Sequence, residues 1–444
     1  MPSFSDRSSP AGAGANAVAR AESAARAQGT ELLHLSDANP AHSGLTPASL
    51  PRSYDPDPRG RLADRQLVAR AVSQWWAQPT ALDPQRLYLL SSTSQAYSWL
   101  FKLLCDPGDV VLAPAPGYPL IEQIARLENV QVSYYRLAMH ERWAIDTAHI
   151  EQLLVSDRAA QGRIKAIVVI NPGNPTGAYV HADERERLVQ LCSRFDLALI
   201  ADEVFWGYPL EGVPACGDCA AQGSPPYTGR ARLTGESRVL TFGLDGLSKN
   251  LGAPGAKLAW IYVSGSEAAV DEVQRRLDAI ADAFLPISDI ISAHLPQLLA
   301  GVPEQREYLS SRCRENLAMV QKMVAHEPSG VTTVLTPEGG WSALIRFPAT
   351  IDEDELVTAL IAGVETSTDA HGQPSFLSAR APTAACTSAA ELAAASTLAV
   401  TVQPGYFFDM PIAGFVCISL LLEPQQLAVG VSALLAEIAR RAQE

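Results

Sequence analysis

The sequence predicts an α/β fold, with a mostly parallel central sheet covered by helices on both faces and a smaller α+β domain after it. Two observations support this prediction. Apolar, β-rich runs alternate with helical patterns through the middle of the chain, which is typical of βαβ units. After about residue 300 that alternation ends, and strand and helix candidates follow one another in a different order.

The strands expected in the large sheet are nearly continuous apolar runs, which suits strands that are covered on both faces. They lie at 110–112, 164–170, 197–201, 238–242 and 257–263. Helices with charged residues on one face are expected at 184–195, 267–285 and 304–324. In the smaller domain we expect strands at 331–335, 342–347, 399–402 and 415–422, a helix at 352–362 and a last helix.

These elements suggest four parts. They are an N-terminal extension (1–30), a segment that packs with the small domain (31–50), a large domain (51–300) and a small C-terminal domain (301–444). Two stretches interrupt the pattern of strands and helices. One, at 212–236, is rich in Gly, Pro and Cys, and the other, at 366–396, is rich in Ala, Ser and Thr, so both are expected to be surface insertions.

The composition argues against several classes of protein. The 34 basic and 48 acidic residues give a net charge of −14, which does not suit a nucleic-acid binder that needs Lys and Arg to meet phosphates. We expect no membrane span, because no apolar window is long enough. The seven scattered cysteines do not form a disulfide framework or a complete metal site, so a cytoplasmic protein without a metal is expected.

Two segments follow apolar strands. The sequence Asn-Pro-Gly-Asn-Pro-Thr-Gly at 171–177 predicts a rigid turn at the carboxyl end of a sheet, where α/β proteins place ligands. Asp202, in Asp-Glu-Val-Phe, ends the next apolar run. Taken alone, the first segment could be a tight turn and the acid a helix N-cap.

Three further segments contain candidate residues. Lys249 lies within a glycine-rich loop at 242–257; a lone loop lysine is usually solvated, but one buried beside an acid would become a nucleophile. The run Leu-Ser-Ser-Thr-Ser-Gln-Ala at 90–96 would in isolation be a helix N-cap. Tyr118, in Pro-Ala-Pro-Gly-Tyr-Pro, would be an ordinary core aromatic.

Together these segments resemble the class I/II aminotransferase family of fold type I pyridoxal-phosphate-dependent enzymes. The resemblance covers about residues 30–440, and the three motifs occur in the family's order. It implies that the cofactor is pyridoxal 5'-phosphate and that Lys249 is the Schiff-base lysine. It also implies that Asp202 pairs with the pyridine nitrogen and that Asn174 hydrogen-bonds the ring oxygen O3′.

The same resemblance implies further contacts. The residues that it places around the phosphate and the ring are Ser92, Thr93, Ser94, Tyr118, Phe205, Ser248 and Lys257. It also implies a homodimer, in which Tyr54 reaches the phosphate of the neighbouring subunit. The implied reaction is a ping-pong transfer of an amino group from an amino acid or related amine to a 2-oxo acid. In that reaction Asp202 keeps the ring nitrogen protonated, and Lys249 later moves a proton as general base.

Four positions depart from the family's commonest pattern. Phe205 replaces a tyrosine, Gly246 a serine and Lys257 an arginine, so two hydroxyl groups and one two-point phosphate contact are lost. The largest departure is Cys417, in Gly-Phe-Val-Cys-Ile-Ser, where the family has an arginine that binds the substrate's α-carboxylate.

The loss of that arginine leaves the substrate side open. Arg346 and Arg380 are candidate substitutes, or the substrate presents its acid differently or lacks one. A lyase or decarboxylase on the same scaffold is therefore the main alternative. A non-catalytic regulator is a weaker one, because the chain is acidic and leaves only some 30 residues before the similar region. A dinucleotide enzyme is weaker still, since the Gly-x-Gly-x-x-Ala match at 12–17 follows no strand.

Overall fold

The computed structural model of the chain describes residues 2–8, 24, 27, 28, 51, 56–76, 81–210, 229–368, 374–379 and 397–443. Its larger sheet has eight strands in the order β1-β8-β7-β6-β5-β2-β3-β4. The strands are β1 (Leu87–Leu90), β2 (Val110–Ala115), β3 (Gln131–Ala138), β4 (Ala144–Ile145), β5 (Ile164–Ile170), β6 (Ala198–Asp202), β7 (Thr241–Gly246) and β8 (Ala259–Ser264). Neighbours from β7 to β3 pair in parallel, whereas β8 and β4 run antiparallel to their neighbours.

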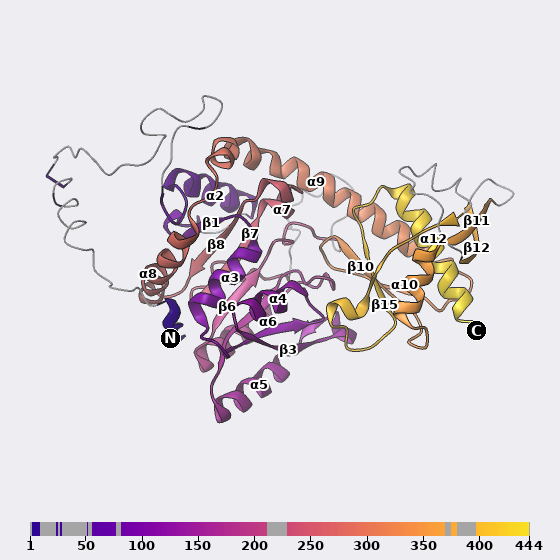
Figure 1. Cartoon of the computed structure of the whole chain (residues 1–444), viewed down its shortest axis with the longest axis horizontal. Helices are drawn as coiled ribbons and strands as arrows, with labels where there is room; N and C mark the ends of the chain where they lie inside the picture. Colours follow the sequence, from indigo (N-terminus) through magenta and orange to yellow (C-terminus); the bar gives the residue numbers. More distant parts are fainter. Residues whose placement is uncertain are drawn as a thin grey trace.

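Helices cover both faces of this sheet (Figure 1). One face packs against α3 (Thr93–Leu104), α4 (Leu120–Leu127) and α8 (Glu267–Phe284), and the other against α5 (Thr147–Ala160) and α6 (Ala182–Phe195). At the β1 and β8 end, α2 (Leu62–Trp75) and the first half of α9 (Asp289–Ala325) form a third cluster. Alternate side chains of each strand point to opposite faces of the sheet. Both sets are mostly apolar, because helices cover both faces.

Several helices begin where the sequence provides a capping side chain. The caps that accept a hydrogen bond from a backbone N–H two or three residues further on are Ser92, Asp146, Ser266, Ser288 and Asp352. Such caps satisfy backbone donors that have no partner inside the helix. Short 3-10 helices also occur at Asp6–Ser8, Pro84–Arg86, Met139–Glu141, Pro254–Ala256 and Gly405–Phe408.

A second, antiparallel sheet has the order β14-β15-β10-β9. Its strands are β9 (Thr333–Leu335), β10 (Ser342–Arg346), β14 (Gln403–Pro404) and β15 (Phe415–Ser419). It packs against the second half of α9, α10 (Glu353–Ala362) and α12 (Pro424–Arg441). Figure 1 shows α9 running from the first sheet to the second, so this one helix joins the two cores.

The observed architecture confirms the predicted fold class, a mostly parallel sheet with helices on both faces followed by a smaller α+β part. One helix is longer than expected. The helix expected at 304–324 begins at Asp289 and includes Pro296 and Pro303, residues that usually end a helix. The domain boundary that we place at residue 300 falls inside α9 and stays a prediction, and most of 1–50 lies outside the described residues.

The two expected insertions are partly described. Residues 229–236 pack beside the large sheet, where Leu233 joins the cluster under α5 and α6. In the second stretch, β11 (Val364–Thr368), β12 (Pro374–Ala379) and β13 (Thr397–Leu398) form a three-stranded sheet, so this stretch contains regular structure.

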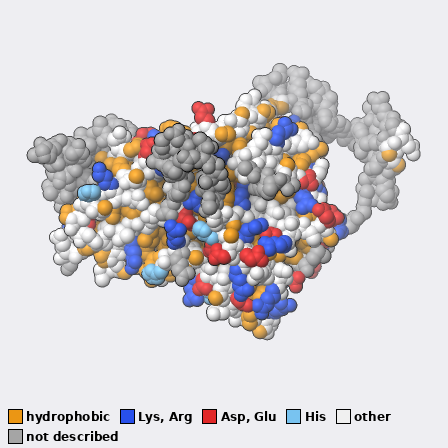
Figure 2. Space-filling view, turned by 180° about the vertical axis from the view of Figure 1, so that it is seen from behind, with side chains coloured by type: hydrophobic (Ala, Val, Ile, Leu, Met, Phe, Trp, Pro, Cys, Tyr) orange, Lys and Arg blue, Asp and Glu red, His pale blue; other side chains and the backbone are white. Residues whose placement is uncertain are grey.

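The described surface carries both acidic and basic side chains, as the composition predicts. Figure 2 shows acidic and basic side chains next to one another over the lower part of the face opposite to Figure 1. Ion pairs such as Arg187 with Glu151 and Arg238 with Glu186 are of this kind. No single helix among the described residues is long and apolar enough to cross a membrane; α8 and α9 meet that criterion only as a pair bent by 115°.

Candidate active site

Three segments meet at the carboxyl edge of the large sheet. β5 leads into the turn at 171–177, β6 ends at Asp202, and β7 leads through Gly246 into the four-residue helix α7 (Leu247–Asn250) that contains Lys249. Asp202 is in register with Ile170 on one side and with Leu244 on the other. Parallel pairing therefore brings together candidate residues that are far apart in the sequence.

Asp202 is a buried carboxylate, with 5% of its surface exposed. It continues the row of Ala198 and Ile200 that faces α3, and there the Tyr97 hydroxyl donates a hydrogen bond to its Oδ2 over 3.0 Å. The backbone N–H of Val204 donates to Oδ1 over 3.3 Å. Burial raises the pKa of Asp202 to about 6, although these hydrogen bonds and the charge of Lys249 oppose the shift. The group is therefore ionised at neutral and higher pH.

Lys249 is half-buried and lies between two aromatic rings. Its Nζ is 5.0 Å from the ring centroid of Phe205 and 5.0 Å from that of Trp341. Burial lowers the pKa of Lys249, and the negative charge of Asp202 partly offsets this effect. The lysine is thus an amine of lowered basicity that faces a carboxylate, which is the environment of a reactive amine.

The short helix that contains Lys249 is fixed at both ends. Asp245 Oδ1 accepts a hydrogen bond from Gly246 N over 2.8 Å and another from Asn250 Nδ2 over 2.6 Å. The Tyr208 hydroxyl donates to the carbonyl oxygen of Lys249. At Gly246 a Cβ would lie 2.9 Å from Cβ of Ala259, so this departure from the family serine is explained by close packing against β8. The backbone around the amine is therefore rigid.

The remaining predicted residues differ in placement. Asn174 is partly buried and lines a pocket beside the 171–177 turn. Tyr118 is 37% exposed; burial raises its pKa, and the charge of Asp202 adds to this shift.

The residues expected near the phosphate lie in three places. The Ser92 hydroxyl caps α3, and Thr93 and Ser94 form its first turn. Ser248 lies in α7, whereas Lys257 is exposed, and among the described residues no hydrogen bond or ion pair joins it to the others. Tyr54 lies outside the described residues.

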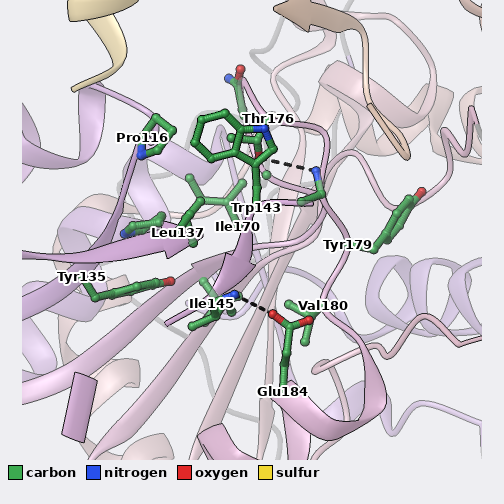
Figure 3. A pocket seen from close by; sticks show the side chains of 15 residues that line it. Pro116, Tyr135, Leu137, Trp143, Ile145, Ile170, Thr176, Tyr179, Val180 and Glu184 are labelled. Atoms are coloured by element: carbon green, nitrogen blue, oxygen red, sulfur yellow. Dashed lines mark hydrogen bonds between the residues drawn. The ribbon is translucent and has the colours of Figure 1, made fainter. Parts of the chain in front are cut away.

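The turn at 171–177 is covered by aromatic and backbone contacts. Trp143, which has an unusual left-handed φ of 62°, lines the same pocket as Thr176 (Figure 3). Gly177 O accepts a hydrogen bond from Gly339 N over 2.9 Å, and a Cβ at Gly177 would lie 2.4 Å from Cβ of Pro337. The turn therefore joins the large sheet to the segment that precedes β10.

This segment brings Trp341 to the site. Tyr179 N donates to Glu338 Oε2 over 3.0 Å, and Gly340 N donates to Tyr208 O over 2.9 Å. Sequence reasoning missed Trp341 and also Tyr97. The signals that could have found them are the Gly-Gly-Trp sequence just before a strand and a tyrosine on the apolar face of α3.

Cys417 lies in β15, in register with Leu344, and has only 4% of its surface exposed. It belongs to an apolar cluster with Trp143, Leu344 and Phe408, and burial raises the pKa of its thiol to about 12. The position is therefore filled by packing. Of the two candidate substitutes, Arg346 lines a different pocket with Thr333 and Ile412, and Arg380 lies outside the described residues.

The set of side chains fits pyridoxal phosphate. Three groups lie at one sheet edge. They are the buried carboxylate of Asp202, whose pKa is about 6, the amine of Lys249, whose pKa is lowered, and the amide side chain of Asn174. The N-terminus of the 12-residue helix α3, with its hydroxyl residues, offers backbone N–H groups and a positive helix end to a phosphate. No group of three or more His, Cys, Asp or Glu in the described part of the chain could hold a metal ion.

Comparisons with known proteins identify a matching family and several relatives. A family model described as aminotransferase class I and II matches residues 56–396. The chain is 24% identical over 293 residues to a tyrosine aminotransferase of Caenorhabditis elegans, covering 66% of this chain and 58% of that protein. It is 27% identical over 253 residues to S-alkyl-thiohydroximate lyase SUR1 of Arabidopsis thaliana, covering 56% of this chain and 49% of the relative.

These alignments span about half of each curated relative. Among solved structures, an alanine aminotransferase from Pyrococcus furiosus matches with a TM-score of 0.67 at 20% identity, covering 87% of this chain and 84% of that chain. At this identity the structural match shows the fold alone.

Proposed function

Because the chain belongs to the aminotransferase class I and II family, we propose that it is a pyridoxal-phosphate-dependent aminotransferase. It would move an amino group between an amino acid or related amine and a 2-oxo acid in a ping-pong cycle. The observation that carries this proposal is the placement of Lys249, an amine of lowered pKa, facing the buried Asp202 at one sheet edge.

Each of these two residues has a defined task in the proposal. When bound, pyridoxal phosphate supplies an electron sink for negative charge that develops at the substrate's Cα. Asp202 would hold the positive charge of the pyridine nitrogen, with Tyr97 orienting its carboxylate. Lys249 would bind the cofactor covalently and, once the substrate amine has displaced it, its free amine would accept and return the Cα proton.

The other predicted residues would hold the cofactor. Asn174 and Tyr118 would contact the ring, and Ser92, Thr93 and Ser94 at the start of α3 would face the phosphate. Ser248 and Lys257 are proposed as further phosphate contacts. A homodimer in which Tyr54 completes the neighbouring site, and a cytoplasmic location, stay predictions.

A lyase on the same scaffold is the second candidate. Two observations favour it: an apolar cluster surrounds Cys417 where the family arginine is expected, and one of the relatives is a lyase. A substrate that is held differently exposes a different bond at Cα to the electron sink, and a different group then leaves.

The test is the visible absorption spectrum of the purified protein, incubated with pyridoxal phosphate, before and after each of a panel of amino acids, combined with product analysis. A 2-oxo acid together with aminated cofactor supports amino transfer. Ammonia, an alkene or carbon dioxide supports the lyase or decarboxylase. A protein that remains colourless after incubation with the cofactor contradicts both.

A further inference from the structure

The indole N–H of Trp341 is a buried donor that has no hydrogen-bond acceptor among the described residues. Buried tryptophan N–H groups usually find an acceptor, because an unpaired buried donor costs free energy. Trp341 therefore either carries an uncompensated cost or donates to a group that arrives with a ligand.

The position of Trp341 favours a ligand. Its ring centroid is 5.0 Å from Lys249 Nζ, the atom proposed to react. The ring packs edge-on against Phe205, with centroids 5.3 Å apart, and against Tyr208, with centroids 5.0 Å apart. The ring that bears this donor is therefore part of the wall around the reactive amine.

The backbone on both sides of Trp341 is fixed. Its carbonyl accepts a hydrogen bond from Leu420 N over 2.8 Å, and the preceding Gly340 N donates to Tyr208 O over 2.9 Å. A donor held in this way loses little conformational freedom when it binds an acceptor, so its hydrogen bond is available at low entropic cost.

The neighbouring protein groups offer this donor no acceptor. Phe205 has no polar side-chain atom, and the Tyr208 hydroxyl donates to Lys249 O but accepts no hydrogen bond from this indole N–H. The oxygens of Asp202 accept bonds from Tyr97 and Val204, and neither of them accepts a bond from the Trp341 N–H. The family's carboxylate-binding position is Cys417, which is enclosed by apolar side chains. A substrate oxygen is the natural partner that remains.

We infer that Trp341 is a substrate-contacting residue whose indole N–H donates a hydrogen bond to the carboxylate of the amino acid or 2-oxo acid. This inference rests on the proposed function, because it assigns the substrate of the same site. A hydrogen bond to a charged group contributes enough to change affinity by about tenfold or more. Trp341 would thus provide part of the preference for a carboxylate-bearing substrate.

The first test compares the wild-type protein with Trp341→Phe, which keeps an aromatic ring but removes the N–H. Both proteins are loaded with pyridoxal phosphate and titrated with L-phenylalanine and with 2-phenylethylamine, which lacks the carboxylate. We expect Trp341→Phe to bind L-phenylalanine about tenfold or more weakly and to bind 2-phenylethylamine unchanged. Equal weakening of both ligands, or no weakening of either, would overturn the inference.

A matched control is Trp99→Phe. Trp99 lies in α3, is 1% exposed and also has an indole N–H without an acceptor among the described residues, but it packs in the core against Phe284. We expect this variant to keep the wild-type ratio of the two affinities. If its ratio changes as much as that of Trp341→Phe, the effect comes from lost packing and the inference fails.

A second test does not depend on amino transfer. In protein labelled with 15N at the indole nitrogen, the Trp341 N–H resonance is identified by its loss in Trp341→Phe. We expect it to shift on titration with 3-phenylpropanoate, which has a carboxylate but no amine, and to stay in place with 3-phenylpropan-1-ol. No shift with the carboxylate contradicts the inference. A shift without any amino transfer would retain the Trp341 contact and reject the proposed function.

Discussion

The carboxyl edge of the large sheet and the β10–β15 ladder of the small sheet contribute to the site in different ways. At the sheet edge, Asp202 is a buried carboxylate that accepts hydrogen bonds from Tyr97 and Val204, and Lys249 is an amine of lowered pKa beside two aromatic rings. In the ladder, Cys417 packs among apolar side chains, and Trp341, which directly precedes β10, offers a neutral donor. Asp202 and Lys249 thus keep the family pattern, whereas Cys417, at the position expected to bind the substrate carboxylate, departs from it. The cofactor side also has departures, at Phe205, Gly246 and Lys257.

The difference has a physical reason. At the sheet edge, the buried carboxylate of Asp202 accepts hydrogen bonds from Tyr97 and Val204, and the free-energy cost of its charge would be offset further by a cationic group bound beside it. An arginine at position 417 would be an unpaired cation in an apolar cluster whenever no substrate is bound. Replacement of such a group by a small apolar residue can be accommodated by packing alone. The substrate side can therefore change while Asp202 and Lys249 are retained.

The largest expected effect is that of Asp202→Asn. Loss of the charge that would pair with the cofactor should lower kcat/KM by about a hundredfold or more. In the apoprotein the same change should raise the free energy of unfolding at pH 8 by up to about 3 kcal/mol, because burial raises the pKa of Asp202 to about 6 and the ionised form is the costly one.

The pH dependence gives the sign of that stability effect. The native protein binds the Asp202 proton more tightly than the unfolded chain, so the stabilisation by Asp202→Asn should shrink as the pH falls from 6 to 4. Urea unfolding of both apoproteins at several pH values measures it. Asp183→Asn, an exposed acid in the first turn of α6, is the control and should show neither effect. A destabilised Asp202→Asn apoprotein at pH 8 would argue against a costly buried carboxylate.

Tyr97→Phe tests the polar support of the sheet edge and should have an intermediate effect. It removes the hydrogen bond to Asp202 Oδ2, which lowers the pKa of that carboxyl, so the pKa should rise above about 6. The acid limb of the pH profile of kcat/KM should move up by about one pH unit. The value of kcat/KM at pH 8 should change less than its value at low pH.

Tyr135→Phe is the matched control, because the Tyr135 hydroxyl donates to the backbone oxygen of Val168 and not to a site residue. Its acid limb should coincide with that of the wild type. An acid limb that does not move in Tyr97→Phe, or that moves equally in both variants, would show that Tyr97 does not tune Asp202.

The smallest expected effect is that of Cys417→Val. Because the thiol packs among Trp143, Leu344 and Phe408, a branched apolar residue of similar size should change the free energy of unfolding by less than about 1.5 kcal/mol. The dissociation constant of 3-phenylpropanoate should stay at the wild-type value. Cys313→Val, in the core between α9 and the small sheet, controls for loss of a buried thiol. A selective loss of carboxylate binding in Cys417→Val would assign the thiol to the substrate.

The sequence was most informative where the fold follows from local pattern. Parallel strands place their carboxyl ends at one edge, so the motifs around Asn174, Asp202 and Lys249 could be expected to meet there. Tyr97 and Trp341 could not be found in this way. They come from a helix across the sheet face and from a segment before another sheet, and only tertiary packing places them beside these residues.

Other differences also have local causes. The first half of α9 was not predicted, because Pro296 and Pro303 usually indicate the end of a helix. The strands β11 and β12 were not predicted, because the Ala, Ser and Thr content of 366–396 is typical of loops. Cys417 could be recognised as a departure from the sequence, but that its surroundings are apolar required the structure.

The central claim is that the amine of Lys249 binds the cofactor covalently. Its most direct test is borohydride reduction of the protein reconstituted with pyridoxal phosphate, followed by peptide mass spectrometry with fragmentation that separates Lys249 from Lys257. The account predicts one stoichiometric adduct on Lys249 and none in Lys249→Ala. A stoichiometric adduct on another lysine, or no adduct in the wild-type protein, would contradict it.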